Sequence, residues 1–210
     1  MGSLIYCGVT DKSISPFLKA WIKQGDQTVC GIIGPGTSRT LASKWDSPLE
    51  QANLGSTGPL QMFANGMQAV SGRTTITTFS STQVWQGNMP LKFSLNLIFM
   101  AQSNAYNEVM MPLEWLEEFA SPDLGFATPG GRIPRSVIIN VGRRIIVPEC
   151  VIENITIPLD KEKNKNGDLI RAEVQLDIQT KVMLNRADIR ETWKGTNDSL
   201  AAAKGSDWQK

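Results

Sequence analysis

The 210 residues of this chain include no histidine, so one of the side chains that most often does chemistry in proteins is missing. Histidine is the commonest general base near neutral pH and the commonest metal ligand. Its absence excludes Ser-His-Asp and Cys-His catalytic arrangements and most transition-metal sites. We therefore expect neither a metal site nor a cofactor, and a protein that is not an enzyme.

The three cysteines, Cys7, Cys30 and Cys150, are far apart in the sequence and odd in number. They form neither a Cys-x-x-Cys zinc pair nor a disulfide framework. The sequence predicts buried thiols in a reducing compartment.

The carboxylates give no catalytic pair. Glu117 and Glu118 are neighbours in a predicted helix and so point in different directions. Glu173 and Asp177 share one face of a predicted strand, but ~13 Å separates them, which is too far for a dyad or a single metal ion.

Two segments could bind anions, and each has a simpler explanation. The glycine-rich segment 31–39 follows a predicted strand but lacks the Gly-Lys-Ser/Thr ending and the Gly-x-Gly-x-x-Gly spacing, so a turn is favoured over a phosphate site. The region 132–144 is locally basic, which favours solvated strand ends or ion pairs between subunits over phosphate contacts. Its basic residues are Arg132, Arg135, Arg143 and Arg144. The run 161–165 reads as a solvated hairpin tip.

The clearest structural element is the segment 170–182, where apolar and polar residues alternate. Successive side chains of a strand point to opposite faces, so this pattern predicts a half-buried β-strand with one polar face. Thr180 is the one interruption of the apolar row. A strand this long and this polar suggests a large, open or water-lining sheet.

Other patterns predict a mainly β chain with short helices. We expect a short helical turn at 15–22, an antiparallel hairpin of strands 73–85 and 91–100 joined by Gly87–Pro90, and a helix from Pro112 to Ala120. Further strands are expected at 3–9 and 28–33, at 136–141 and 145–149 on either side of Gly142-Arg143-Arg144, and at 151–159. A hairpin loop is expected at 161–168 and a short helix at 186–193.

Two segments lack a core-forming pattern. The segment 34–72 is rich in Gly, Pro, Ser and Asn, and long loops of this kind are often binding or assembly elements. The tail from Gly195 is small and polar. We expect N-terminal strands and an extension at 1–34, an insertion loop at 35–72, a core domain at 73–194 and a flexible or partner-ordered tail at 195–210.

The order of these elements resembles the tube fold of contractile phage tails, in particular baseplate tube-initiator and tail-tube proteins. The resemblance covers about 73–184: a hairpin precedes a short helix, and a last hairpin carries a charged turn. Its motifs lie at Asn107–Leu116, Pro134–Asn140, Val151–Ile157, Lys161–Asp168 and Ala172–Thr180.

The resemblance implies a mainly β (α+β) fold of two packed antiparallel sheets with long hairpins and a flanking helix. In that family six subunits close their sheets into a barrel-shaped ring whose lumen holds the tape measure protein and passes DNA. Closing a ring removes exposed strand edges. By resemblance, the polar row would face the lumen, and its two cations, two anions and two amides would let DNA slide past. That row is Arg171, Glu173, Gln175, Asp177, Gln179 and Lys181.

Contacts between subunits are expected from isolated anchors and basic residues. Six tryptophans against two tyrosines is an unusual balance, and tryptophan is enriched at interfaces. The expected contact residues are Trp45, Met62, Phe63, Arg143, Arg144, Lys161, Lys163, Lys165 and Trp208.

The resemblance implies a structural virion protein, a baseplate ring subunit that joins the tail tube to the hub, assembled in the host cytoplasm. Its partners would be itself, other baseplate or tube proteins, the tape measure protein and passing DNA, without membrane insertion.

The insertion at 34–72 favours an initiator over a repeated tube subunit, and a tail-tube subunit or a neck connector stays open as an alternative. So do a ligand-binding β-barrel and a histidine-free enzyme. A single-strand nucleic-acid binder is disfavoured by a net charge of +1 and by the absence of stacking aromatics on the polar row.

Overall fold

The computed structural model describes residues 5–46, 83–122 and 133–194 and divides the chain into two units. The first unit comprises Met1–Leu41 with Pro90–Lys210, and the second is Ala42–Met89. Within the described residues, no helix is long and apolar enough to cross a membrane.

The first unit is a β-barrel. Its strands are β1 (Ile5–Gly8), β2 (Lys19–Gln24), β3 (Gln27–Ile33), β4 (Ser38–Thr40), β7 (Lys92–Met100), β8 (Val137–Val141), β9 (Ile145–Thr156) and β10 (Arg171–Thr180). They form one sheet in the order β1-β3-β2-β8-β9-β10-β7-β4, and an additional pairing of β3 with β7 closes it. Six antiparallel strands, β3-β2-β8-β9-β10-β7, therefore form a complete circuit.

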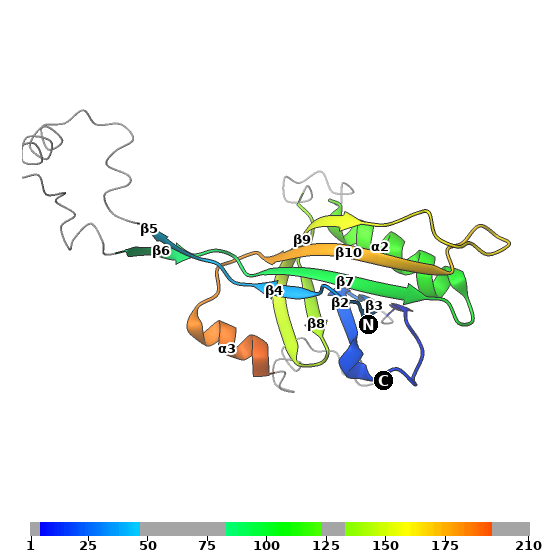
Figure 1. Cartoon of the computed structure of the whole chain (residues 1–210), viewed down its shortest axis with the longest axis horizontal. Helices are drawn as coiled ribbons and strands as arrows, with labels where there is room; N and C mark the ends of the chain where they lie inside the picture. The colour runs from blue at the N-terminus through cyan, green and yellow to red at the C-terminus, as the bar shows by residue number, and fades with distance from the viewer. Residues whose placement is uncertain (1–4, 47–82, 123–132, 195–210) are drawn as a thin grey trace, which may run out of the picture. The chain divides into compact units, whose positions relative to one another are not determined.

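The mainly β prediction is confirmed, but the described strands of this unit form one closed sheet rather than two packed ones. Closure depends on a short ladder in which Ile32 pairs with Ile98 and Ile33 with Leu97. β7 and β10 run side by side, and β8 with the first half of β9 crosses them (Figure 1). Because β9 turns from one layer into the other, two layers belong to one continuous sheet.

The strand predicted at 170–182 is confirmed as β10, whose inner and outer residues alternate along its length. Ala172, Val174, Leu176 and Ile178 are at most 1% exposed and point into the barrel. Thr180 is also buried, because its hydroxyl accepts a hydrogen bond from Leu91 N at 3.0 Å and donates one to Val182 O at 2.8 Å.

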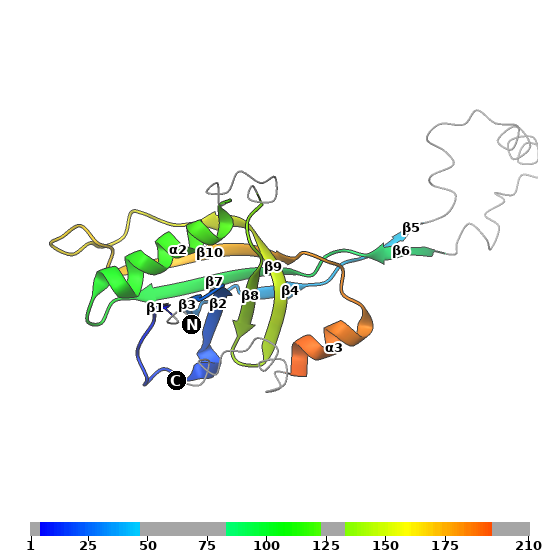
Figure 2. The same ribbon diagram turned by 180° about the vertical axis from the view of Figure 1, so that it is seen from behind.

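In its described part, the first unit also contains two α-helices. The π-helical turn η3 (Tyr106–Met110) leads into α2 (Met111–Ala120), which confirms the helix expected from Pro112. The apolar face of α2 joins the barrel core through Leu113, Leu116 and Phe119. Seen from behind, α2 lies in front of β7 and β10 in the view (Figure 2), and its contacts with the sheet include β9, β1 and β3. The helix predicted near 186–193 is confirmed as α3 (Arg186–Lys194), which packs against β9.

Three local predictions are corrected. The residues expected to form a helical turn at 15–22 give a short 3-10 turn, η1 (Pro16–Leu18), and then β2. Burial of both faces of β2 between two neighbouring strands outweighs its weak helical pattern. The break expected at Gly142-Arg143-Arg144 is confirmed, since β8 ends at Val141 and β9 begins at Ile145. The separate strand expected at 151–159 is instead the continuation of β9, which runs on through Pro148 and Glu149, where the backbone φ is +52°.

The hairpin expected between 73–85 and 91–100 is also wrong in its pairing. In the described residues β7 pairs with β10, β3 and β4, while β6 (Val84–Asn88) pairs with β5 (Ser43–Asp46) in the second unit. Gly87–Pro90 does not reverse the chain, since Asn88 still belongs to β6 and Met89 donates its N–H to Ala42 O. Residues 73–82 lie outside the described residues, as does most of the expected insertion at 35–72.

Candidate functional site

The described residues offer little for catalysis. They contain no group of three or more Cys, Asp or Glu side chains placed to hold a metal ion. All three thiols are buried, and burial is the main cause that raises the pKa of Cys30 to about 11 and that of Cys150 to about 12. Thiolate chemistry at neutral pH is thereby suppressed.

The most conspicuous acid is Glu108, which is 4% exposed beside a small pocket. Burial disfavours its ionised form, but hydrogen bonds from the N–H groups of Gln102 and Ser103 and from the hydroxyls of Ser103 and Thr10 outweigh burial and lower its pKa to about 2. A carboxylate held ionised by so many donors is a poor proton carrier at neutral pH. Its contacts indicate that it fixes the loop between β7 and η3.

The polar row predicted from sequence lies on the outer face of β10. Arg171, Glu173 and Gln175 are exposed, and Asp177 and Gln179 are partly exposed. Lys181 lies just after the strand and is exposed as well. The row is therefore brought together, on the side of β10 that faces away from the barrel core.

Neighbouring strands extend this row into a larger surface, here named the polar face. The register places Asn96, Ser94 and Lys92 of β7 opposite Gln175, Asp177 and Gln179. On the other side, Thr156 and Asn154 of β9 lie opposite Gln175 and Asp177. Ser38 and Thr40 of β4 lie opposite Ser94 and Lys92 and continue the face to a fourth strand. Sequence reasoning did not assign these residues to the site, although the alternation of Lys92, Ser94 and Asn96 was visible.

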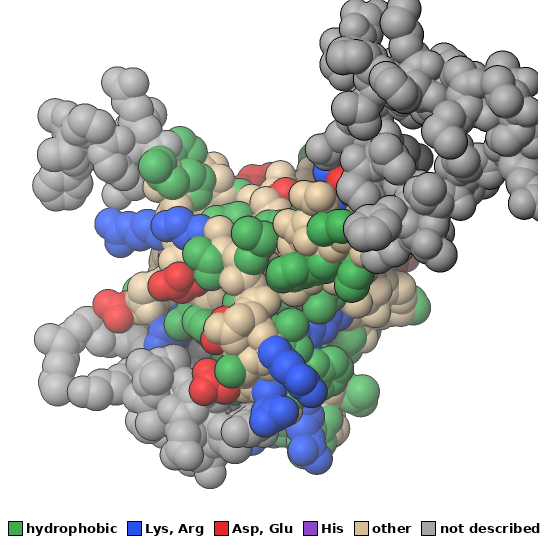
Figure 3. All heavy atoms as spheres, turned by 90° about the vertical axis from the view of Figure 1, so that its left-hand side faces the viewer, with side chains coloured by type: hydrophobic (Ala, Val, Ile, Leu, Met, Phe, Trp, Pro, Cys, Tyr) green, Lys and Arg blue, Asp and Glu red, His purple; other side chains and the backbone are tan. Residues whose placement is uncertain are grey.

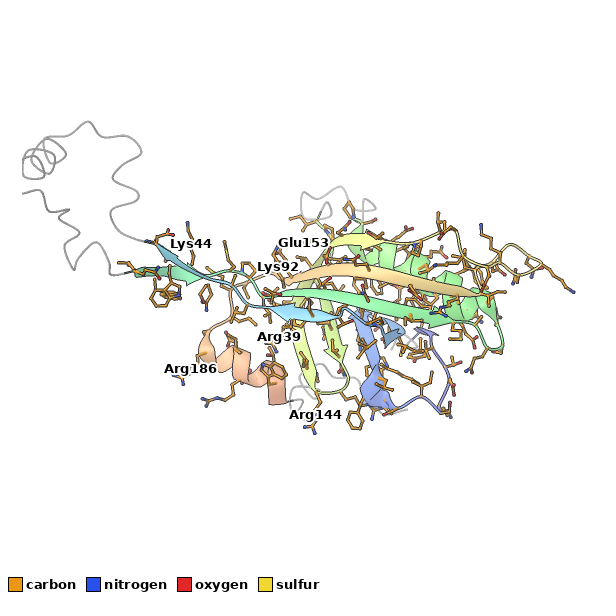
Figure 4. The ribbon with its side chains drawn as sticks, viewed as in Figure 1. Arg39, Lys44, Lys92, Arg144, Glu153 and Arg186 are labelled. Atoms are coloured by element: carbon orange, nitrogen blue, oxygen red, sulfur yellow. The ribbon has the colours of Figure 1, made fainter. Side chains whose placement is uncertain are left out.

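The charges of the polar face are balanced. Arg171 donates a hydrogen bond to Glu173 at 2.5 Å along β10. Lys92 of β7 reaches Glu153 of β9 across the intervening strand at 3.2 Å, and Figure 4 labels both side chains. With Lys181 and Asp177, the face carries three cations and three carboxylates, so its formal charge is zero. One end is less polar, since Ile98 and Met100 lie opposite Glu173 and Arg171.

The expected contact residues are not gathered in one place. Trp45 of β5 is 54% exposed and lies opposite Trp85 of β6, which is 53% exposed. Trp85 is not among the residues predicted to make contacts, because its pairing with Trp45 depends on the register of β5 and β6. Met62, Phe63 and Trp208 lie outside the described residues.

The basic contact candidates lie in two turns of the first unit. Arg143 and Arg144 form the turn between β8 and β9, and the guanidinium of Arg143 lies 5.7 Å from the centre of the Trp21 ring. Lys161, Lys163 and Lys165 are exposed in the loop that precedes β10. Figure 3 shows the side of the molecule that is on the left in Figure 1, away from the 161–168 loop, and there basic and acidic side chains stand among apolar ones. This intermixed surface has no uniform charge.

No family model matches this chain, and no curated protein matches its sequence.

Proposed function

We propose that the protein is a structural subunit of a contractile phage tail, a baseplate ring component whose polar face lines the channel. The observation that carries this proposal is the polar face itself: four strands present Ser, Thr, Asn, Gln and balanced charges to solvent over an apolar barrel core. A surface without net charge offers a passing polyanion neither the counter-ion release that drives binding nor strong repulsion.

The edges of this four-stranded layer also support assembly. Among the described strands, β4 pairs only with β7, and residues 151–156 of β9 pair only with β10. The layer β4-β7-β10-β9 is antiparallel throughout, so β9 of one copy beside β4 of the next would continue the alternation. Unpaired strand edges invite pairing with another chain, and closure into a ring removes them.

Within this function, the copies would associate with one another, with other baseplate or tube proteins, with the tape measure protein and with DNA that passes without sequence-specific binding. The protein would act in the virion without catalysing a reaction. The interior of the barrel is filled by apolar side chains such as Leu95, Phe99 and Leu176, which counts against a ligand-binding barrel.

The first experiment is mass measurement of the purified protein followed by negative-stain imaging. Rings are expected, alone or on a template of hub protein, and long tubes would favour the tail-tube subunit instead. A monodisperse monomer that binds small ligands or turns over a substrate, with or without hub protein, would refute the proposal.

A second experiment tests which surface faces the channel. Gln175→Cys places a thiol on the polar face, and Lys165→Cys places a matched thiol in the exposed loop before β10. Both should react with biotin-maleimide in assembled rings, but streptavidin should bind only at position 165, because the channel excludes it. Equal streptavidin binding at both positions in rings would remove the polar face from the channel.

A further inference from the structure

A pocket opens at the end of the polar face where β7 finishes and β10 begins. Its described lining comes from β3, β7, η3 and the loops that follow β1 and β7. The apolar part of its wall is formed by Val9, Ile14, Ile32 and Met100. With the open mouth included, the empty volume is about 310 Å³. This is near the lower limit for ligand pockets, so one or two side chains fill it.

The pocket is acidic as well as apolar. The described residues that line it include two acids, Asp11 and Glu108, and no lysine or arginine. Hydrogen bonds keep Glu108 ionised, and Asp11 is partly exposed. Two cations belong to the same stretch of chain as Asp11: Lys19 donates to its main-chain oxygen, and Lys12 is exposed. Neither of them lines the pocket, which therefore suits an apolar side chain accompanied by a cation.

A segment of the complementary chemistry follows β9. Leu159 is 69% exposed, more than any other large hydrophobic side chain among the described residues, and Lys161 is exposed as well. Residues two apart on an extended chain point to the same side, so both side chains can contact one surface. The loop beyond them extends past the start of β10 (Figures 1 and 2). It is held in place by a hydrogen bond of 2.9 Å from Ile170 N to Glu162 O.

The strand register places the pocket and this segment at the same level, on opposite borders of the layer β4-β7-β10-β9. Ser38 of β4 lies opposite Ser94 of β7, and Asn154 of β9 is level with Ser94 across β10. Towards the same end of the layer, Met100 follows Ser94 by six residues and Leu159 follows Asn154 by five. Each step is about 3.3 Å of extended chain, so both residues lie about 15–20 Å beyond that level.

We propose that the pocket of one copy receives Leu159 and Lys161 of the neighbouring copy in the ring. This inference rests on the proposed function, in which β9 of one copy lies beside β4 of the next. Leu159 packs against the apolar wall, and Nζ of Lys161 pairs with the carboxylate of Asp11. Because the pocket and the segment are different surfaces, the contact is head-to-tail and repeats around a closed ring.

The charges of the contact are tested by exchanging them. Lys161→Glu and Asp11→Lys should each raise the protein concentration at half assembly by at least about fivefold, and the double variant should recover most of this loss. Asp11→Lys also removes hydrogen bonds to Ser13 and Gln102, so recovery in the double variant is the informative result. Lys165→Glu, at an exposed position of the same loop, is the control and should change the concentration less than about twofold. A double variant no better than Asp11→Lys alone would overturn the pairing.

A disulfide between copies tests the position of Leu159 directly. Leu159→Cys is combined with Ile14→Cys, and assembled rings are treated with copper–phenanthroline as the oxidant. Denaturing gels without reductant should show a ladder from dimers up to the full ring. Met183→Cys with Ile14→Cys is the matched control, because Met183 is 63% exposed but follows β10 at its other end, and it should give no ladder. The native thiols Cys7, Cys30 and Cys150 are buried and stay out of the reaction.

The outcomes separate this contact from the proposed function. Rings that form but give no ladder from the pair at positions 159 and 14 would overturn the contact and leave the ring intact. Equal ladders from this pair and from the control pair would also overturn it, because the crosslink would then not depend on position. If the wild-type chain forms no rings, with or without hub protein, the proposed function fails and the contact fails with it.

Discussion

Replacing Glu108 by glutamine tests whether this buried acid stabilises the fold as an ionised carboxylate that accepts hydrogen bonds. Its Oε2 accepts the N–H of Gln102 at 2.5 Å and that of Ser103 at 3.0 Å. Its Oε1 accepts the hydroxyls of Ser103 at 2.9 Å and Thr10 at 3.1 Å. The carboxylate thus ties Thr10, two residues after the end of β1, to the loop between β7 and η3. Glutamine keeps the shape of the side chain but replaces one acceptor oxygen by an NH2 group, which would face N–H or O–H donors and could not accept their hydrogen bonds.

The size of the effect follows from the pKa. Hydrogen bonding outweighs burial and lowers the pKa of Glu108 from 4.5 to about 2. Each pKa unit corresponds to about 1.4 kcal/mol, so the ionised form contributes about 3 kcal/mol to the free energy of unfolding at neutral pH. Because the pKa is lower in the folded state, this contribution is complete above the unfolded pKa near 4.5 and disappears as pH falls toward 2.

The assay is urea unfolding followed by tryptophan fluorescence at pH 7, 5 and 3. Glu108→Gln should lower the free energy of unfolding by about 2–3 kcal/mol at pH 7, and the difference from wild type should shrink between pH 5 and 3. Glu114→Gln, at an exposed position in the first turn of α2, is the control and should change little. A pH 7 loss below about 0.5 kcal/mol, or a difference that does not change with pH, would refute the reasoning.

Three further predictions concern the fold. Leu176→Ala should lower the free energy of unfolding in urea by about 2–5 kcal/mol, because Leu176 is 0% exposed in the barrel core. Its neighbour Gln175 lies on the polar face, so Gln175→Ala should lower that free energy by less than about 0.5 kcal/mol, and similar losses for both variants would contradict the inward and outward alternation of β10. Gly142→Ala should lower the melting temperature more than Gly25→Ala. Both glycines have φ near +60°, but only at Gly142 would a Cβ lie 2.8 Å from a backbone oxygen, that of Phe17. Equal shifts in melting temperature would exclude this close approach of Gly142 to Phe17. Arg39→Ala should lower the free energy of unfolding by about 1–2 kcal/mol and speed amide hydrogen exchange in α3. The guanidinium of Arg39 lies 4.6 Å from the centre of the Trp193 ring and donates a hydrogen bond to the hydroxyl of Thr192 at 2.8 Å, and both residues belong to α3. Unchanged exchange would show that other contacts hold α3.

Local alternation was enough to predict β10, and β7 at 91–100, as strands, but not that the two strands pair. The burial pattern of 171–180 follows the apolar and polar periods of the sequence, because one face packs into the barrel along the whole strand. The pairing of β7 with β10 joins segments far apart in the chain, and no local pattern specifies it. The interruption at Thr180 likewise became intelligible only with its two hydrogen bonds to Leu91 and Val182.

The candidate site was predictable to the same extent. Period-2 alternation identified the row on β10, whereas the residues that complete the polar face come from three other strands through register alone. The ion pair of Lys92 with Glu153 depends on a β-bulge near Ile178, where the register of β9 against β10 shifts. No residue pattern in the sequence predicts this bulge, which inserts one extra residue of β9 opposite β10.

The closed barrel changes the argument for self-association. The sequence suggested that a strand as long as β10 needs other subunits to complete its sheet, but within one chain β7 pairs with β10 from Arg171 to Gln179 and β9 pairs with it from Gln175 to Thr180. The need for a partner therefore moves to β4 and to residues 151–156 of β9, the borders of the layer that carries the polar face. Folding requires the inner face of that layer to be apolar and places little constraint on the outer one. An outer face that combines Ser, Thr, Asn and Gln with cancelling charges, between two edges able to pair, is the basis on which we propose that this face meets other molecules after assembly.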